Sequence, residues 1–161
     1  MIILGIDPGI ADTGFGVIND EKGQLKAVAY GSIKTKANLP LPERLAELYT
    51  KLVEVIKIYK PQKAAIEQLF FCNNAKTALI VGQARGVAML VCQQAGLPIA
   101  EFTPLQVKQA VATYGGADKR QVQRMVQIIL NLKEIPKPDD AADALAIAIC
   151  GLNNQMIDKL S

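Results

Sequence analysis

The stretch IILGIDPG, residues 2–9, decides the fold of this chain. Its apolar and β-branched residues predict a buried strand, and Pro8-Gly9 ends the strand as turn residues do. The last strand residue is a carboxylate, Asp7. An ionised group beside an apolar core is costly unless a cation or hydrogen-bond donors meet it. We therefore expect a metal ion at Asp7, and further acidic residues that converge on it.

The bulk properties predict one domain, residues 1–161, because the chain has 161 residues and half of them are hydrophobic. We expect neither a secretory signal nor a stretch long and apolar enough to span a bilayer, hence no membrane partner. The cysteines are widely spaced and form no C-x-x-C pair, at Cys72, Cys92 and Cys150. This spacing favours a reducing, cytoplasmic location over a disulfide framework or a structural zinc site.

The sequence has no histidine, which excludes Ser-His-Asp and Cys-His catalysis and every histidine-based zinc site. Enzymatic chemistry would have to use carboxylates, lysines, hydroxyls or a bound metal. The net charge is +3, and basic residues gather in the second half of the chain. A polyanionic partner fits this distribution, although many ordinary proteins share it. The basic residues concerned are Lys108, Lys119, Arg120, Arg124, Lys133 and Lys137.

The pattern after the first strand predicts an α/β fold with a mixed five-stranded sheet flanked by helices. Three strands joined by short connections form an antiparallel meander, and two later strands, each preceded by a helix, run parallel to the first. The first strand then lies centrally, between its hairpin partner and the fourth strand. The expected strands after the first are 13–18, 25–33, 63–69 and 97–102, with a turn at 19–23, and the expected helices are 43–59, 75–95, 104–113, 119–132 and 139–152.

Three further acidic residues are expected beside Asp7. Glu67 ends the apolar part of the fourth strand, and the carboxyl ends of neighbouring parallel strands form ligand sites in open α/β sheets. The helix that begins near residue 139 carries Asp140 and Asp143 on one face. Asp139 and Asp143 share a face equally well by spacing, and aspartates in a first turn also serve as helix caps.

Carboxylates on separate elements, without histidine or clustered cysteine, suit a hard cation such as Mg²⁺ or Mn²⁺. Two such ions promote phosphodiester hydrolysis by stabilising the attacking and leaving oxygens. That mechanism uses water as the nucleophile, so the lack of histidine does not oppose it.

Five motifs together closely resemble the RuvC family of bacterial Holliday junction resolvases. They are ILGIDPG, AIEQLF, GQARGVA, QVKQ and DAADALAIA, at residues 3–9, 65–70, 82–88, 106–109 and 140–148. The resemblance covers nearly the whole chain, in order. It implies an RNase H-like fold, a homodimer and Mg²⁺-dependent paired nicking of four-way DNA junctions. It also implies a role in recombination and repair beside the RuvAB branch-migration complex, and two Mg²⁺ per site, for which Mn²⁺ can substitute.

The resemblance assigns roles by position. Asp7, Glu67, Asp140 and Asp143 match the metal-binding carboxylates, which leaves Asp139 as a cap. Lys108 and Lys119 match lysines needed near the scissile phosphate, where a point charge is useful, although most lysines are simply solvated. Phe70 matches an aromatic presented to junction bases, whereas Phe71 fits the core. Weaker candidates for DNA backbone contacts are Arg120, Arg124, Lys76 and Arg85, of which Arg85 also fits a structural role.

The helix 75–95 is apolar nearly all round, which predicts burial on more than one side. Burial within one domain explains this pattern, and the resemblance favours a two-fold dimer interface instead.

Two other functions are weaker. An actin-like phosphotransferase also starts with a Gly-Ile-Asp strand but needs two domains and an adenosine site. Gly9 to Gly14 has P-loop spacing, but Phe15 replaces the required lysine. A catalytically silent junction-binding module remains open, although the presence of all four carboxylates argues against it.

Overall fold

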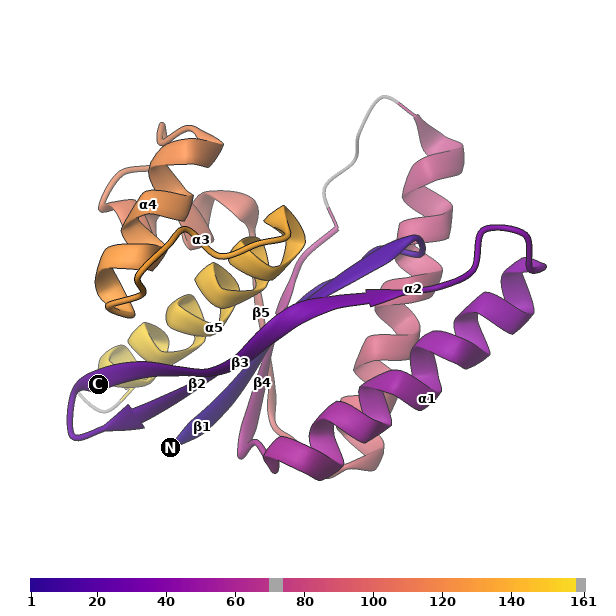
Figure 1. Cartoon of the computed structure of the whole chain (residues 1–161), viewed down its shortest axis with the longest axis horizontal. Helices are drawn as coiled ribbons and strands as arrows, with labels where there is room; N and C mark the ends of the chain where they lie inside the picture. The colour runs from indigo at the N-terminus through magenta and orange to yellow at the C-terminus, as the bar shows by residue number, and fades with distance from the viewer. Residues whose placement is uncertain (70–73, 159–161) are drawn as a thin grey trace.

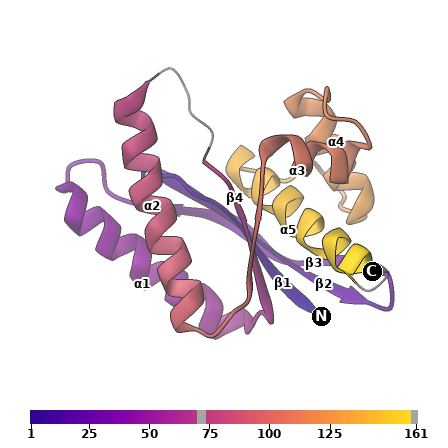
Figure 2. The ribbon, with the colours of Figure 1, turned by 180° about the vertical axis from the view of Figure 1, so that it is seen from behind.

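The computed structural model describes residues 1–69 and 74–158, with side chains as far as Leu152. A five-stranded sheet in the order β3-β2-β1-β4-β5 separates two layers of helices. Helices α1 and α2 cover one face, and α3, α4 and α5 cover the other (Figures 1 and 2). The strands are β1 (Ile2–Asp7), β2 (Asp12–Glu21), β3 (Gln24–Lys34), β4 (Lys63–Glu67) and β5 (Ile99–Phe102). The helices are α1 (Leu41–Tyr59), α2 (Ala75–Gln94), α3 (Pro104–Ala112), α4 (Lys119–Ile129) and α5 (Asp139–Asp158).

Strand β1 is central, as expected, and pairs antiparallel with β2 and parallel with β4. Successive strand side chains point to opposite faces. Leu4 and Ile6 belong to the core under α1 and α2, whereas Ile3 belongs to the core under α5. The same alternation directs Asp7 toward the α5 layer. The strand pattern therefore delivers the carboxylate to a defined face as well as to a defined end.

The β2–β3 hairpin is longer than the sequence pattern predicted. The expected five-residue turn at 19–23 is wrong, because the ladder continues to the pair Glu21 and Gln24. Only Lys22 and Gly23 form the turn, with positive φ values of 55° and 88°, as two-residue hairpin turns require. The side chains at the turn end of the hairpin face solvent. Polar residues there are therefore compatible with a strand.

Helix ends differ from expectation for local reasons. Helix α1 begins at Leu41, before Pro42, because proline in a first helical turn breaks no intrahelical hydrogen bond. Helix α4 ends at Ile129, and Asn131 just beyond it has a left-handed φ of 50°. Helix α5 continues past Leu152 to Asp158, where no proline stops it.

Helix α5 lies directly on β1 and β2, because small residues face each other there. A Cβ added at Gly5 would collide with the backbone carbonyl of Ala144, and one at Gly14 with that of Asp140. Ala141 and Ala142 are buried in the same contact. This close approach brings the first turn of α5 to the end of β1, which side chains at the glycine positions would prevent.

Helix α2 is only partly covered by its own chain. Ala84 and Ala88 are fully buried, whereas the side chains of Leu79 and Leu90 are 71% and 50% exposed. By length and composition this helix could cross a membrane, since its mean hydropathy is 1.3. This finding departs from the expectation that no stretch is long and apolar enough to do so. No other helix in the described part of the chain is long and apolar enough to cross a membrane. The core helices of folded proteins can have the same length and composition. The apolar face of α2 needs a partner that this chain alone does not provide.

Candidate metal centre

Four carboxylates meet at one edge of the sheet. Asp7 is the last residue of β1 and Glu67 the last of β4, one position beyond the paired residues Ile6 and Ile66. Helix α5 adds Asp140 and Asp143 from its first turns. Carboxylate oxygens of Asp7, Asp140 and Asp143 lie within 4.8 Å of one another. Residues far apart in the sequence thus converge as the β1 motif indicated.

The electrostatics of the cluster are unfavourable without a cation. The pKa of Asp7 is raised from 3.8 to about 8, first by burial and then by the charges of Glu67, Asp143 and Asp140, while the charge of Lys119 lowers it. Burial, followed by the charge of Asp143, raises the pKa of Glu67 from 4.5 to about 6. Each carboxylate therefore disfavours the ionised form of its neighbours. A divalent cation would instead favour the ionised form of each carboxylate. An all-oxygen donor set fits Mg²⁺ or Mn²⁺.

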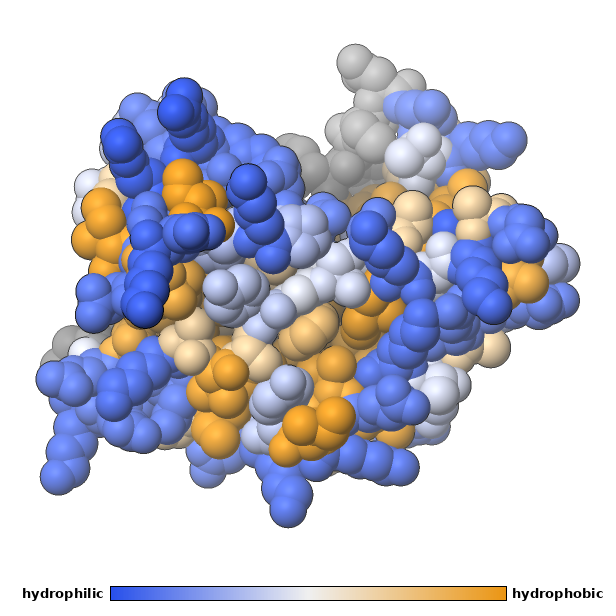
Figure 3. Space-filling view, in the orientation of Figure 1, coloured by the Kyte–Doolittle hydropathy of each residue, from blue (hydrophilic) through white to orange (hydrophobic). Residues whose placement is uncertain are grey.

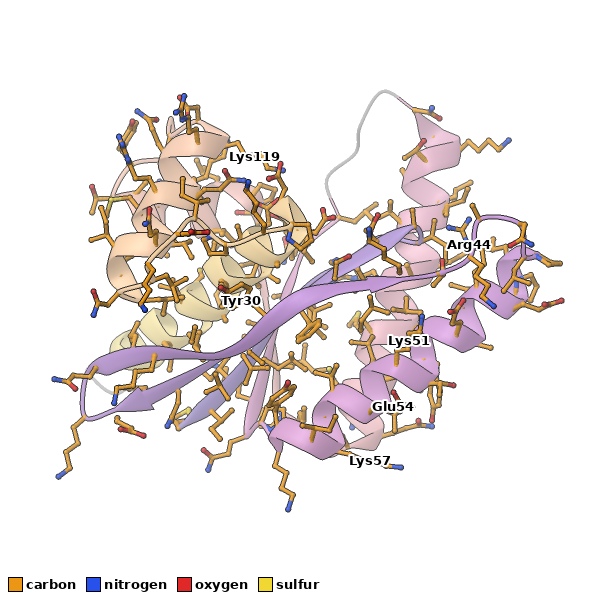
Figure 4. The ribbon with its side chains drawn as sticks, in the orientation of Figure 1. Tyr30, Arg44, Lys51, Glu54, Lys57 and Lys119 are labelled. Atoms are coloured by element: carbon orange, nitrogen blue, oxygen red, sulfur yellow. The ribbon has the colours of Figure 1, made fainter. Side chains whose placement is uncertain are left out.

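Lys119 contributes a positive charge from the N-terminus of α4, which Asp118 and Gln121 cap. Its Nζ lies 3.2 Å from an oxygen of Asp143 and 3.4 Å from one of Asp139 (Figure 4). Burial lowers the pKa of Lys119, but the two aspartates outweigh this effect and raise it overall. The pKa of Asp143 is raised overall: burial is the largest cause, Lys119 lowers the pKa through its charge and its hydrogen bond, and the charges of Asp140 and Asp139 raise it.

Asp139 belongs to the rim of the site. Its carboxylate contacts Lys119 and also accepts a hydrogen bond of 3.1 Å from Nε2 of Gln123. Both partners lie on α4, so the Asp139 side chain points toward that helix. In the described part of the chain, the residues whose oxygens cluster are Asp7, Asp140 and Asp143, the register that the family resemblance selected.

Two cavities flank the Asp7–Glu67 pair. The first has a volume of about 270 Å³ and adds Asp143, Lys108 and Lys119 to the pair, over an apolar floor that includes Val107 and Val122. The charge of Lys108 opposes the rise in the pKa of Glu67. The second cavity, of about 210 Å³, extends toward α2 and is lined by Gln68, Leu69, Val81 and Arg85, among others. The first cavity thus places two cations beside the carboxylates.

The remaining predicted residues lie outside the carboxylate cluster. Arg120 and Arg124 are exposed on α4, and Lys76 is exposed near the start of α2. Arg85 is mostly buried and paired with Glu101 of β5. Phe70 and Phe71 fall outside the described residues.

Sequence reasoning missed the residues that hold the loop after Asp7. Arg44 of α1 donates hydrogen bonds to the hydroxyl of Thr35, at 2.9 Å, and to the carbonyl of Ile10, at 3.4 Å (Figure 4). The buried hydroxyl of Thr13 donates to the carbonyl of Gly9. The contact from Arg44 to Ile10 joins residues 34 positions apart, and an arginine on an amphipathic helix carries no local signal of such a role.

The sheet order and the carboxylates at its edge define a class of protein. A hairpin meander continued by parallel strands, with acidic residues on β1, β4 and the helix packed across them, is the arrangement of an RNase H-like nuclease domain. The family model described as crossover junction endodeoxyribonuclease RuvC matches residues 3–151. The chain belongs to this family.

Individual relatives agree with the family match over nearly the whole chain. A crossover junction endodeoxyribonuclease RuvC from Syntrophomonas wolfei is 53% identical over 159 residues, which cover 99% of this chain and 92% of that protein. One from Brevibacillus brevis is 55% identical over 149 residues, or 92% and 90% of the two chains. The solved Thermus thermophilus RuvC in complex with Holliday junction substrate is 36% identical, with a TM-score of 0.93 and coverage of 98% and 96%.

Proposed function

We propose that this chain is a Mg²⁺-dependent endonuclease that resolves four-way DNA junctions by two symmetric nicks. The observation that carries the proposal is the convergence of Asp7, Asp140 and Asp143, within 4.8 Å, in a fold of the RuvC family. Its relatives are crossover junction endodeoxyribonucleases, and T. thermophilus RuvC has been solved with a Holliday junction. The proposal treats residues 1–161 as one nuclease domain that acts in recombination and repair.

The four carboxylates would hold the metal. Asp7 and Glu67 end two neighbouring strands, and Asp140 and Asp143 come from the helix packed on the sheet, so regular secondary structure positions all four donors. Two Mg²⁺ ions held by these residues would supply activation of the attacking water and stabilisation of the leaving oxygen. The oxygen donors also accept Mn²⁺.

Lys119 and Lys108 would act on the phosphate. Both line the cavity that contains Asp7 and Glu67, and Lys119 is already held there by Asp143. A phosphate that enters this cavity meets two ammonium groups, and positive charge there stabilises the additional negative charge of the transition state. Burial lowers the pKa of Lys119, but Asp143 and Asp139 raise it overall and so favour its charged form.

The surface around the cavity suits a DNA backbone. Hydrophilic residues gather over α3 and α4 beside the site (Figure 3). Arg120 and Arg124 on α4 and Lys76 on α2 are exposed and free to reach phosphates, which position a duplex without reading its sequence. Phe70 stands three positions after Glu67 in the sequence. We propose that it stacks against junction bases.

The exposed apolar face of α2 supports a homodimer. Leu79, Gly86 and Leu90 lie along one side of this helix and are exposed, and no described atom lies within 4 Å of a Cβ added at Gly86. A second copy of α2 would cover this face and create two equivalent metal sites. Two sites suit a junction in which two strands are cut. The proposal includes a cytoplasmic location, no membrane, and cooperation with the RuvAB complex.

One assay tests the central proposal. The protein is incubated with an end-labelled four-way junction and with linear duplex, in Mg²⁺ and in chelator, beside Asp7→Asn. We expect Mg²⁺-dependent paired nicks in the junction alone, and a loss of roughly 10³-fold or more in Asp7→Asn, because a ligand to the catalytic metals contributes several kcal/mol.

The same assay separates the alternative of a silent junction-binding module. Junction binding in chelator with no cleavage in either Mg²⁺ or Mn²⁺ would favour that module. Cleavage of linear duplex at an equal rate would contradict structure selectivity.

A further inference from the structure

Arg85 of α2 connects the ends of two strands at the metal site. Its Nε donates a hydrogen bond of 3.1 Å to the backbone carbonyl of Glu67, the last residue of β4. Its terminal guanidinium nitrogen pairs with the carboxylate of Glu101 on β5. The Arg85 side chain is 19% exposed, so these contacts are partly shielded from water. One planar cation thus bridges the backbone of one strand and a side chain of the next.

The position of Glu67 makes this contact consequential. Strand β4 pairs with β1 only as far as Ile66, and the ladder with β5 ends at the pair Glu67 and Phe102, followed by a 2.7 Å hydrogen bond from Gln68 to Phe102. Glu67 therefore lies where the sheet stops supporting the backbone on one side. A charge-assisted hydrogen bond to its carbonyl adds support at that residue.

We propose that Arg85 is a positioning residue for Glu67: it fixes the backbone of Glu67 so that the carboxylate faces the metal site, and Glu101 holds the guanidinium in the required orientation. Arg85 acts on the backbone and not on the carboxylate charge. Its hydrogen bond at Glu67 goes to the backbone carbonyl, at 3.1 Å. Arg85 lines the second cavity together with Glu67, whereas Lys108 and Lys119 line the first.

The inference deepens the proposed function and rests on it for the role of Glu67 as a metal ligand. It also connects two parts of that proposal. Gly86, the next residue, lies on the exposed face of α2 that we assign to the dimer, whereas Arg85 reaches inward. The helix that would bring the two copies together is therefore hydrogen-bonded to the backbone of Glu67 at each metal site.

The test compares Arg85→Gln, Arg85→Lys and Glu101→Gln with the unmodified chain. Binding of Mg²⁺ is followed by calorimetry and by the rise in thermal midpoint, neither of which requires cleavage. We expect Arg85→Gln to weaken Mg²⁺ binding about 10-fold or more, in the range found when groups that orient metal ligands are removed. Lysine offers one point charge in place of the planar fork, so Arg85→Lys should restore part of the affinity. Glu101→Gln should weaken it less than Arg85→Gln.

Junction binding in chelator separates positioning from DNA contact. We expect it to stay within about 2-fold for all three variants, while the Mg²⁺ concentration for half-maximal cleavage rises in step with the binding constant. Lys57→Gln, which removes an exposed positive charge from α1 on the same side of the sheet, is the matched control and should change neither quantity.

Two results would overturn the inference. If Arg85→Gln binds Mg²⁺ normally but binds the junction more weakly, Arg85 is a phosphate contact. If Arg85→Gln leaves both Mg²⁺ binding and junction binding unchanged, Arg85 has no role at the site. If Arg85→Gln does not fold, Arg85→Lys and Glu101→Gln decide the question by the same measurements. Failure of the proposed function has a different result: the unmodified chain binds Mg²⁺ normally but does not cleave the junction.

Discussion

Asp7 is a carboxylate whose charge is opposed by burial and by three other carboxylates. This is unusual for a residue kept only for stability, because a neutral side chain would fit the end of β1 at lower cost. Such a cluster of buried carboxylates is the arrangement expected of a cation-binding site. Lys119 supplies part of the missing positive charge through its contact with Asp143.

The pKa of Asp7 leads to a prediction for the metal-free protein. The pKa rises from 3.8 to about 8 on folding, so between these values the folded state binds more protons than the unfolded state. The free energy of unfolding in chelator should therefore fall as the pH rises through this window. One pKa unit corresponds to about 1.4 kcal/mol. A change of 1 kcal/mol shifts the thermal midpoint by roughly 2–4 °C for a domain of this size.

Thermal unfolding in chelator from pH 5 to pH 9 provides the measurement. Asp7→Asn should be more stable than the unmodified chain at pH 8 and should lose less stability as the pH rises. Mg²⁺ at pH 8 should raise the midpoint of the unmodified chain by several degrees and that of Asp7→Asn much less. Glu54→Gln, an exposed change on α1, is the control for removal of a carboxylate charge. A pH-independent midpoint would contradict the assignment.

At the scale of elements, the site depends on how closely α5 approaches β1 and β2. The pair Asp7 and Gly14 lies across the β1–β2 ladder, and a Cβ at Gly14 would meet the backbone of Asp140. Close packing of backbone on backbone leaves no flexible atom that could yield. The distance between Asp7 and the α5 carboxylates is therefore set by glycine and alanine, which take no part in chemistry.

Gly14→Ala should displace the first turn of α5 from the sheet. We expect a loss of about 1–3 kcal/mol in the free energy of unfolding, as for other overpacked sites, and weaker binding of Mg²⁺ by at least about 10-fold. Urea unfolding and Mg²⁺ titration measure the two effects. Gly116→Ala, at an exposed glycine where a Cβ meets only ordinary contacts, should leave stability nearly unchanged. Full Mg²⁺ affinity in Gly14→Ala would show that α5 can shift without harm.

At the scale of the whole molecule, one side of α2 is left uncovered. The described chain buries Ala84 and Ala88 and exposes Leu79 and Leu90, so the apolar pattern has an inner and an outer half. The inner half packs against α1 and the sheet. The outer half is suited to a second copy, and paired nicking of a symmetric junction requires two active sites in one particle.

The combined change Leu79→Lys and Leu90→Lys should give a monomer, because two ammonium groups and their copies would be buried at the proposed interface. Sedimentation equilibrium measures the oligomeric state. On a supercoiled plasmid with an extruded cruciform, the variant should yield nicked circles where the unmodified chain yields linear product. Ile58→Lys, at an apolar side chain 68% exposed on α1, should remain a dimer. A dimeric double variant would place the interface elsewhere.

The sequence by itself determined a good part of this protein. The IILGIDPG strand, the order of strands and helices and the central place of β1 follow from local patterns, because side-chain periodicity and turn residues act over a few positions. The family was indicated by the resemblance of five motifs. Strand ends and helix faces can also be read locally, which made Asp7, Glu67 and Asp143 candidates, whereas the choice of Asp140 over Asp139 came from the family resemblance. The hairpin turn was misplaced because polar residues occur in solvent-facing strands as well as in turns.

Only the tertiary structure decided the distances and partners. The distances among Asp7, Asp140 and Asp143, the raised pKa of Asp7, the close approach at Gly14, the Arg85 bridge and the uncovered side of α2 all depend on how segments far apart in the chain pack together. Packing between distant residues sets burial and close approach, and these leave no periodic mark in the sequence. Asp7 could be recognised from its strand alone, but the charge it carries depends on which residues the fold brings to it.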